Sequence, residues 1–288
     1  MTDEAANAGW FAGVEPGGDG AREAIRNGSA AEPDAWPERA VEAGVVDSED
    51  DYYEWLHEAT VAATREAVRE RERADDRQLV HAIRTVDDLA SEVNELAERH
   101  AEWAGSLFEG SGSGVEYARS VAGRETATPV EERVVSLAER VVDLAEEREA
   151  TRAFIERQAP AVAPNLAALA GPVLAARLVE LAGGLEALAK MPSGTVQVLG
   201  AEDALFAHLR GHAPSPKHGV IFTHEYVRGT RQEDRGSAAR ALAGKLTIAA
   251  RIDHYSGDRR PELEAELDER IAAIRARADA GDGGESDD

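Results

Sequence analysis

Cysteine is absent from all 288 residues, which excludes disulfides, thiolate zinc sites and a thiol nucleophile. Aromatic residues make up only 5%, and no apolar run reaches the roughly 18 residues that a membrane-spanning helix needs. The first ten residues lack the basic start and the apolar stretch of a signal peptide. These absences predict a cytoplasmic protein that makes no use of a membrane.

Motifs that bind cofactors or build catalytic centres are also missing. The sequence has no GxGxxG after a strand pattern, no P-loop and no GxSxG elbow. His208 and His212 have the i, i+4 spacing of helical zinc ligands, but Gly211 interrupts the helix between them and no acidic general base accompanies them. We therefore expect no catalytic residue, no metal and no cofactor.

Lysine is scarce in a chain that is otherwise rich in charge. The 32 basic and 56 acidic residues give a net charge of −24, yet only three of the basic residues are lysines, Lys190, Lys217 and Lys245. Such a composition is typical of salt-accumulating archaea, where concentrated salt screens charge repulsion within about 3 Å at 1 M. An acidic protein of an ordinary cell is the alternative.

The acidity is unevenly distributed. Residues 160–257 hold ten Lys/Arg and eight Asp/Glu, a net of +2, whereas the remainder holds 22 and 48, a net of −26. All three lysines and five of the eight histidines lie in this window. A near-neutral region in an otherwise strongly acidic chain indicates an anionic partner.

Two stretches carry apolar residues at alternating spacings of four and three, the seam of a coiled coil. A Gly/Ser-rich break at 110–114 separates them, which predicts an antiparallel hairpin; two amphipathic helices of an ordinary bundle are the alternative. We expect Pro160 and Pro164 to end the second helix. The first seam is Leu79, Ile83, Val86, Ala90, Val93, Ala97, His100, Ala104 and Leu107, and the second is Val130, Val134, Leu137, Val141, Leu144, Arg148, Thr151 and Ile155.

The ends of the chain differ from this helical middle. Residues 1–50 are rich in Gly, Pro, Asp and Glu, with a short strand expected at 10–14 and a short helix at 21–28. Near the other end, long helices are predicted at 235–255 and 261–278, and 220–223 is read as a short strand or buried turn. The polar, acidic residues 280–288 predict a disordered tail.

Several segments in fixed order resemble the Nop family. The stretch APNLAALAGPVLAARLVELAGGLEALAKMPSGTVQVLGAEDALFAHL (163–209) looks like the signature of the Nop domain, as do PKHGVIF (216–222) and RGSAARALAGKLTIAARID (235–253). The stretch DRQLVHAIRTVDDL (76–89) is similar to the first coil of the same family. Two positions depart from the pattern, because Asp203 and Ser237 stand where lysine is common.

The resemblance implies a scaffold of a box C/D RNA-guided methylation particle, in the style of the archaeal branch. Family members bind the methyltransferase fibrillarin, pair two copies through a coiled coil, and grip a kink-turn of guide RNA together with its ribosomal-type protein. The expected fold is mainly α: an antiparallel coiled-coil hairpin and an all-helical Nop domain, with a small α+β N-terminal module. The expected domains are 1–70, a fibrillarin-binding module; 71–160, the coiled coil; 161–257, the Nop domain; and 258–288, a helix and acidic tail.

Residue chemistry indicates where RNA would bind. The loop 211–219 supplies glycines for close approach, Lys217 for phosphate and the His218 ring for an unstacked base. Arg240 and Arg251 lie eleven residues apart, about three turns and ~16 Å along one helix face, although salt bridges on a solvated face are an alternative role. The full set of expected RNA ligands is Gln197, Gly200, Ala201, Arg210, Lys217, His218, Arg240, Lys245 and Arg251.

Two other functions compete with the scaffold. A coiled-coil dimer without RNA would explain the seams but not the near-neutral window with its loop cations. An RNA-modifying enzyme would explain an RNA site, but it lacks a cofactor or nucleophile motif to support it.

Overall fold

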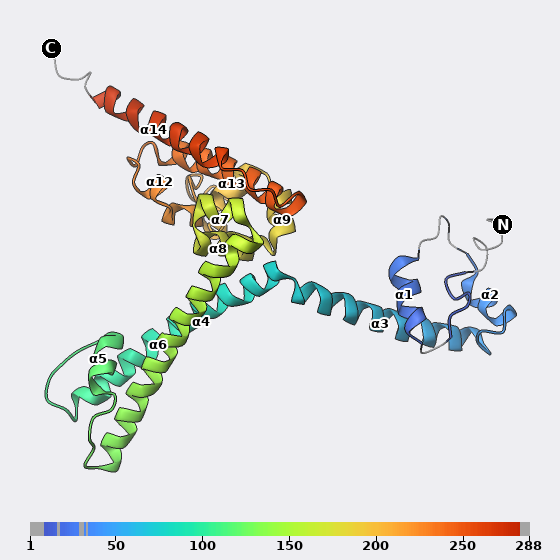
Figure 1. Cartoon of the computed structure of the whole chain (residues 1–288), viewed down its shortest axis with the longest axis horizontal. Coiled ribbons are helices and arrows are strands. Elements are labelled where there is room, and N and C mark those ends of the chain that lie inside the picture. Colours follow the sequence, from blue (N-terminus) through green and yellow to red (C-terminus); the bar gives the residue numbers. More distant parts are fainter. Residues whose placement is uncertain (1–8, 16–17, 29–31, 33, 283–288) are drawn as a thin grey trace. The chain divides into compact units, whose positions relative to one another are not determined.

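The computed structural model describes residues 9–15, 18–28, 32 and 34–282, with side chains described as far as residue 277. The chain divides into two compact units, Met1–Ala74 and Asp75–Asp288, here called the N-terminal and C-terminal units. Every regular element of the described residues is helical (Figure 1).

The N-terminal unit is built on an aromatic cluster. Its helices are α1 (Asp19–Asn27), α2 (Trp36–Glu42) and α3 (Glu49–Arg73), and Ser48 caps α3 by accepting from the Asp51 N–H at 3.2 Å. The buried residues of the cluster are Phe11, Ala21, Ala40, Tyr52, Trp55 and Ala59. The strand expected at 10–14 was wrong: these residues form turns, because Phe11 is drawn into the cluster. The described part of the module is helical, not α+β.

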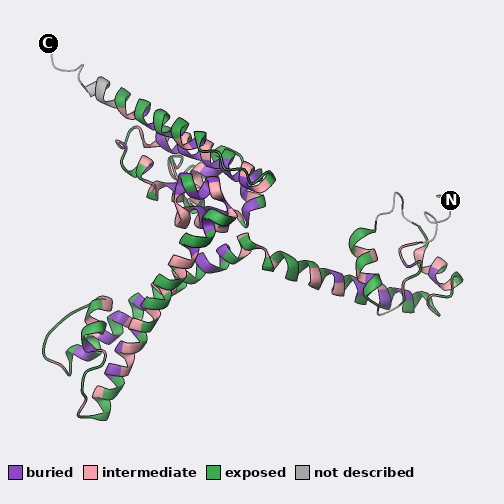
Figure 2. Ribbon diagram, viewed as in Figure 1, coloured by how far each residue is buried: buried purple, intermediate pink, exposed green. Residues whose placement is uncertain are grey.

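A helical hairpin opens the C-terminal unit. Its two long helices, α4 (Asp75–Gly105) and α6 (Pro129–Val162), pack along each other with the short helix α5 (Gly114–Val121) against both. Figure 2 shows the buried residues of α4 and α6 on their facing sides. Thr128 and Glu131 form a reciprocal capping box at the start of α6. The sequence did not predict α5.

The seam of α4 matches the predicted spacing better than that of α6. Six of the nine positions of the first expected seam are buried, whereas Leu107, which lies beyond the end of α4, is 39% exposed. On α6 the buried line runs through Ala138 and Ala145, and the expected Leu137 and Leu144 are only half-buried. The α5 helix packs on both α4 and α6, so the buried faces are set by three helices instead of two.

Proline positions set the end of α6. Pro160 lies inside the helix, so the expectation that it ends the helix was wrong. A proline at the third-last position removes only one hydrogen bond of the last turn, which the helix tolerates. Ala163, held at ψ 75° before Pro164, ends the helix instead.

Short helices complete the C-terminal unit. The two long helices predicted near the end are confirmed, the first at its predicted bounds. Residues 280–282 of the predicted tail continue the last helix, and 283–288 lie outside the described residues. The elements are α7 (Pro164–Ala170), α8 (Pro172–Ala182), α9 (Leu185–Lys190), α10 (Ser193–Val198), α11 (Glu202–Leu209), the 3-10 turn η2 (Val220–Thr223), α12 (Glu225–Arg228), α13 (Arg235–Tyr255) and α14 (Glu262–Asp282).

Two apolar cores stabilise the C-terminal unit. The larger core includes Leu79, Ile83 and Ile155 at the base of the hairpin together with buried residues of α7 to α10 and α12 to α14. The smaller core lies at the far end of the hairpin, between Val93 and Ala104 on α4 and between Val134 and Ala145 on α6. Between the cores, residues 88–92 and 147–153 include no buried residue.

A buried carboxylate joins elements that are far apart in the sequence. Asp253, near the end of α13, accepts the backbone N–H groups of Asn165 at 3.0 Å and Leu166 at 2.8 Å, and so caps the start of α7. The Asn165 side chain donates to Asp253 at 2.6 Å and to the Asp258 carbonyl at 2.7 Å, and it accepts the Arg260 N–H at 2.6 Å. One network thus fixes α7, the end of α13 and the link to α14.

Among the described residues no single helix is long and apolar enough to cross a membrane, although α7 and α8, bent by 115° from each other, meet both criteria as a pair.

We expect Asp253→Asn to lower the free energy of unfolding by about 1.5–3 kcal/mol, because an amide oxygen cannot accept all the bonds that the carboxylate accepts. Chemical denaturation measures the change. Asp258→Asn is the control, since its side chain is exposed and the network uses only its carbonyl. Equal losses in the two variants would contradict the capping role.

A second prediction concerns His100, which is fully buried in the smaller core and whose two ring nitrogens have no hydrogen-bond partner among the described residues. Burial lowers the pKa of His100, so the folded state excludes a proton that the unfolded state binds below about pH 6.5. Stability should therefore be complete above that pH and fall as the pH falls toward the depressed pKa of the folded state, by at most ~1.4 kcal/mol per pH unit.

The measurement is denaturant unfolding between pH 7.5 and 5.5, for the natural chain and for His100→Leu. His218 and His224, whose pKa values burial also lowers, contribute equally in both proteins, so the difference isolates His100. Parallel pH profiles would show that protonation of His100 costs nothing.

Candidate nucleic-acid interface

The 210–219 loop is attached to α10 by close backbone contact. The N–H groups of Gly219 and Val220 donate to the carbonyls of Gln197 at 2.9 Å and Leu199 at 2.8 Å. A Cβ on Gly219 would lie 2.0 Å from the Leu199 oxygen, so only glycine permits this approach. The Gln197 side chain also donates to the Lys217 carbonyl at 2.7 Å. Two of the expected ligands, Gln197 and Lys217, are thereby brought together.

Lys217 and Arg240 share one face of α13. The alkyl chain of Lys217 passes Gly236, whose hypothetical Cβ would lie 3.7–3.8 Å from it. Arg240 is four residues further on, on the same face, and it is exposed. The loop cation and the helix cation therefore present their charge to the same side of the C-terminal unit.

His218 is already stacked within the protein. Its ring lies nearly parallel to that of Phe222, with centroids 4.6 Å apart, and the Arg235 guanidinium lies 5.3 Å from the Phe222 centroid. Burial, and then the charge of Arg235, lower the pKa of His218, so a neutral imidazole is favoured. The stacked His218 ring holds the loop in place. Because one of its faces is covered by Phe222, at most the other face can stack on an RNA base.

Two other expected ligands lie elsewhere. Lys245, nine residues beyond Gly236 and so on the opposite side of α13, is ion-paired with Glu266 of α14. Arg251 lies on the face of Arg240, but its guanidinium donates to the carbonyls of Ala189 at 3.0 Å and Met191 at 3.4 Å, at the end of α9. Both side chains make structural contacts in this chain.

The remaining expected ligands flank α11. Gly200 adopts φ +81° and donates its N–H to the Glu202 carboxylate at 2.8 Å, and Ala201 precedes the helix as its N-cap. Arg210 is exposed at the other end. Of the ten cations in residues 160–257, four make no ion pair, carbonyl hydrogen bond or ring contact with any described residue: Arg210, Lys217, Arg228 and Arg240.

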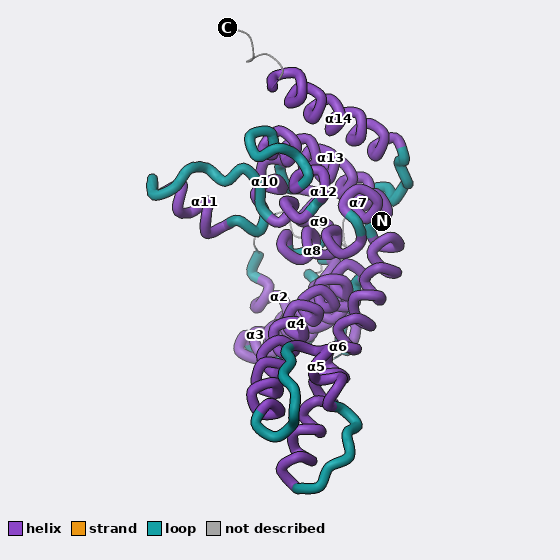
Figure 3. The backbone as a smooth tube through the Cα atoms, turned by 90° about the vertical axis from the view of Figure 1, so that its left-hand side faces the viewer, coloured by secondary structure: helices purple, strands orange, loops and turns teal. Residues whose placement is uncertain are grey.

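Sequence reasoning missed the apolar surface of α11. No residue of this helix is buried, and Phe206 and Leu209 are 56% and 70% exposed. Figure 3 shows α11 and its loops standing out from the other helices of the unit. Large exposed apolar side chains on a projecting helix indicate a protein contact. The sequence signal was only two large apolar residues three apart, a pattern that a buried helix face would also give.

Metal binding has no support in the described residues, which contain no group of three or more His, Asp or Glu side chains that could hold an ion. The Nδ1 atom of His208 is hydrogen-bonded to the Ala213 carbonyl at 3.0 Å, so that ring orders the loop.

Comparisons with known proteins identify relatives of this chain. An uncharacterised NOP5 family protein of Methanocaldococcus jannaschii is 33% identical over 273 residues, covering 82% of this chain and 66% of that protein. Nucleolar protein 58 of Scheffersomyces stipitis is 32% identical over 245 residues, with coverages of 70% and 48%. The chain thus spans between about half and two thirds of the length of these relatives.

A solved structure supports the same relationship. A chain in the crystal structure of a fibrillarin/Nop5p complex matches with a TM-score of 0.52 and 26% identity, covering 88% of this chain and 91% of that one. The Nop family model, described as "snoRNA binding domain, fibrillarin", matches residues 74–275, which include the whole interface described above. The chain belongs to the Nop family.

Proposed function

We propose that this chain is the scaffold of a box C/D RNA-guided 2′-O-methylation particle, which binds guide RNA and proteins and does not itself catalyse a reaction. Membership of the Nop family and relatives named as nucleolar proteins 56 and 58 support the assignment to this class of particle. The observation that carries it is the combination, in residues 197–240, of unpaired cations with a projecting apolar helix.

A composite surface of RNA and protein suits this combination. Lys217 and Arg240 provide charge for phosphates, while Phe206 and Leu209 provide apolar area for a protein already bound to the RNA. In concentrated salt the gain from counterion release is small, so a salt-adapted protein relies more on shape and apolar contact. The kink-turn-binding ribosomal-type protein is the proposed occupant of the α11 surface.

Fibrillarin is the second proposed protein partner. The solved relative is in complex with fibrillarin, and the match covers 88% of this chain, so it extends beyond the C-terminal unit. The N-terminal unit, with its own aromatic core, is the proposed fibrillarin-binding module. In that arrangement the bound methyltransferase catalyses the methyl transfer, and this chain positions it relative to the guide RNA.

We favour a scaffold over an RNA-modifying enzyme because the perturbed groups of the C-terminal unit have structural explanations. A hydrogen bond to Asp268 raises the pKa of Tyr226 to about 12, and that bond joins α12 to α14. Burial lowers the pKa of His224, whose ring bonds the Leu169 carbonyl at 3.0 Å. Neither group belongs to the cation-bearing interface.

The RNA assignment predicts which charges matter. Replacing Lys217 and Arg240 together by alanine should weaken binding to a kink-turn RNA loaded with its ribosomal-type protein by about tenfold, because two charge-assisted contacts are lost. Fluorescence anisotropy in molar KCl measures the affinity. The matched control is Lys190→Ala with Lys245→Ala, which removes the same charge from residues paired with Glu186 and Glu266. Equal weakening by both double variants would place the RNA elsewhere.

Pairing of two copies through the hairpin is a further part of the proposal. The far end of the hairpin exposes Trp103, Leu107 and Val130 by 39–47%. Leu107→Glu with Val130→Glu should lower the mass measured by light scattering from that of a dimer to that of a monomer. Val68→Glu, at an apolar position of α3 that is 54% exposed, is the control. An unchanged mass in the double variant would exclude this surface as the dimer contact.

A further inference from the structure

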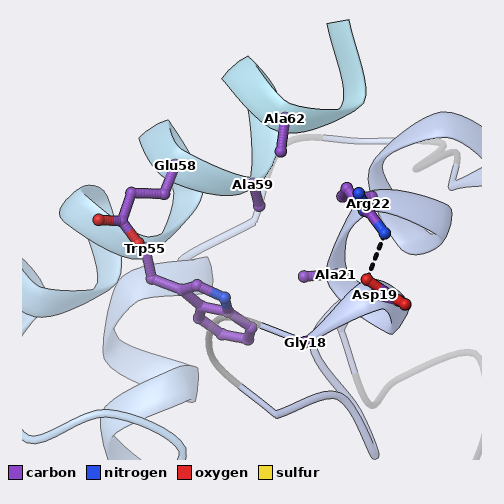
Figure 4. A pocket seen from close by; sticks show the side chains of 8 residues that line it. All are labelled: Gly18, Asp19, Ala21, Arg22, Trp55, Glu58, Ala59 and Ala62. Atoms are coloured by element: carbon purple, nitrogen blue, oxygen red, sulfur yellow. Dashed lines mark hydrogen bonds and ion pairs between the residues drawn. The ribbon is translucent and has the colours of Figure 1, made fainter. Parts of the chain in front are cut away.

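A small cavity in the N-terminal unit lies between α1 and α3. It has a volume of about 210 Å³ and is open to the surface. Its lining is apolar at one side, through Trp55 and alanines, and polar at the other. Figure 4 shows its residues, which are Gly18, Asp19, Ala21, Arg22, Trp55, Glu58, Ala59 and Ala62.

The indole of Trp55 has an unused hydrogen-bond donor. Trp55 is only 5% exposed, and its Nε1 has no hydrogen-bond partner among the described residues. In Figure 4 the edge of the ring that carries this nitrogen is turned toward Ala21 across the cavity. A buried donor without an acceptor destabilises a fold. The ring of the neighbouring Trp10 lies 4.7 Å from that of Trp55 between centroids. In contrast to Trp55, the indole N–H of Trp10 has a partner, because it donates to the Tyr52 hydroxyl at 3.0 Å.

The start of α1 adds a second preference for an acceptor. Gly18 precedes the helix and has no side chain to cap it. The partial positive charge of the helix N-terminus therefore lies at the cavity, with no side-chain acceptor from the part of the chain that the structure describes. The acceptor should nevertheless be uncharged. Asp19 and Glu58 line the cavity against one cation, Arg22, which already pairs with Asp19 and lies 3.9 Å from Glu66.

We propose that this cavity binds the side-chain amide of an asparagine or glutamine presented by a protein partner. The amide oxygen accepts from Trp55 Nε1, and the amide NH₂ donates to the carboxylates of Asp19 or Glu58. Nε1 has almost no accessible surface in the free chain, so binding requires a small rotation of the indole. A volume below the roughly 300 Å³ of small-molecule sites favours one protruding side chain over a free metabolite. This inference goes beyond the proposed role in RNA binding and does not depend on it.

Propionamide is the probe, because it carries the amide on a short alkyl chain. In ¹H–¹⁵N spectra of the full chain, the Trp55 indole resonance should shift and saturate with a Kd on the order of ten millimolar. Propionate should bind at least fivefold more weakly. A shift that grows linearly without saturation, or equal binding of propionate, would overturn the proposal.

Two variants and one further ligand sharpen the test. Trp55→Phe keeps an aromatic ring and removes the donor, so the backbone resonances of Ala59 and Ala62 should lose their saturable shifts. Trp103→Phe, in the other unit, should leave them unchanged. If Trp55→Phe does not fold, the comparison of propionamide with propionate on the natural chain still tests the proposal.

Free L-glutamine binding more than tenfold tighter than propionamide would overturn the assignment to a partner's side chain. No RNA or second protein is present, so failure here leaves the RNA test unaffected.

Discussion

The carboxylate of Asp253 is the contact on which the arrangement of the C-terminal unit depends. It lies near the end of α13, 8% exposed, yet it caps α7 at Asn165, 88 positions earlier in the chain. Without it, the first N–H groups of α7 would be buried near Asn165 with no acceptor, since Ala163 offers no cap. Through Asn165 the same network holds the backbone of residues 258–260, from which α14 starts. The face of α13 that carries Arg240 is therefore fixed relative to α7 and α14.

The elements that follow from local sequence were predictable. Alternating spacings of four and three gave the facing residues of α4, and alanine-rich residues 235–255 gave α13 at its observed bounds. Neither the α5 helix nor the buried line of α6 through Ala138 and Ala145 was predictable. Both depend on packing among three helices and not on the spacing of apolar residues within one helix. Residues 10–14 had the composition of a strand, but the aromatic cluster takes Phe11 into its interior instead.

Candidate site residues were harder to place. Residue type identified Lys217 and Arg240, which the structure brings to one side, but it also selected Lys245 and Arg251, whose partners are Glu266 and the carbonyls that end α9. No local pattern distinguishes an available cation from a paired one, because the partner is contributed by another part of the chain. The projecting side chains of Phe206 and Leu209 likewise became visible only when α11 proved to have no buried face.

The two separate cores of the hairpin have a consequence for how the family can diverge. Residues 88–92 and 147–153 bury no side chain and belong to neither core, so they form a spacer between cores that stabilise themselves. Adding or removing seven residues in both helices there would move the far core by ~10 Å along the axis, with a rotation of only ~20°. Arm length can therefore change in evolution in whole heptads while both cores keep their packing. The distance between partners bound at the two ends would then differ among relatives by multiples of the length of one heptad.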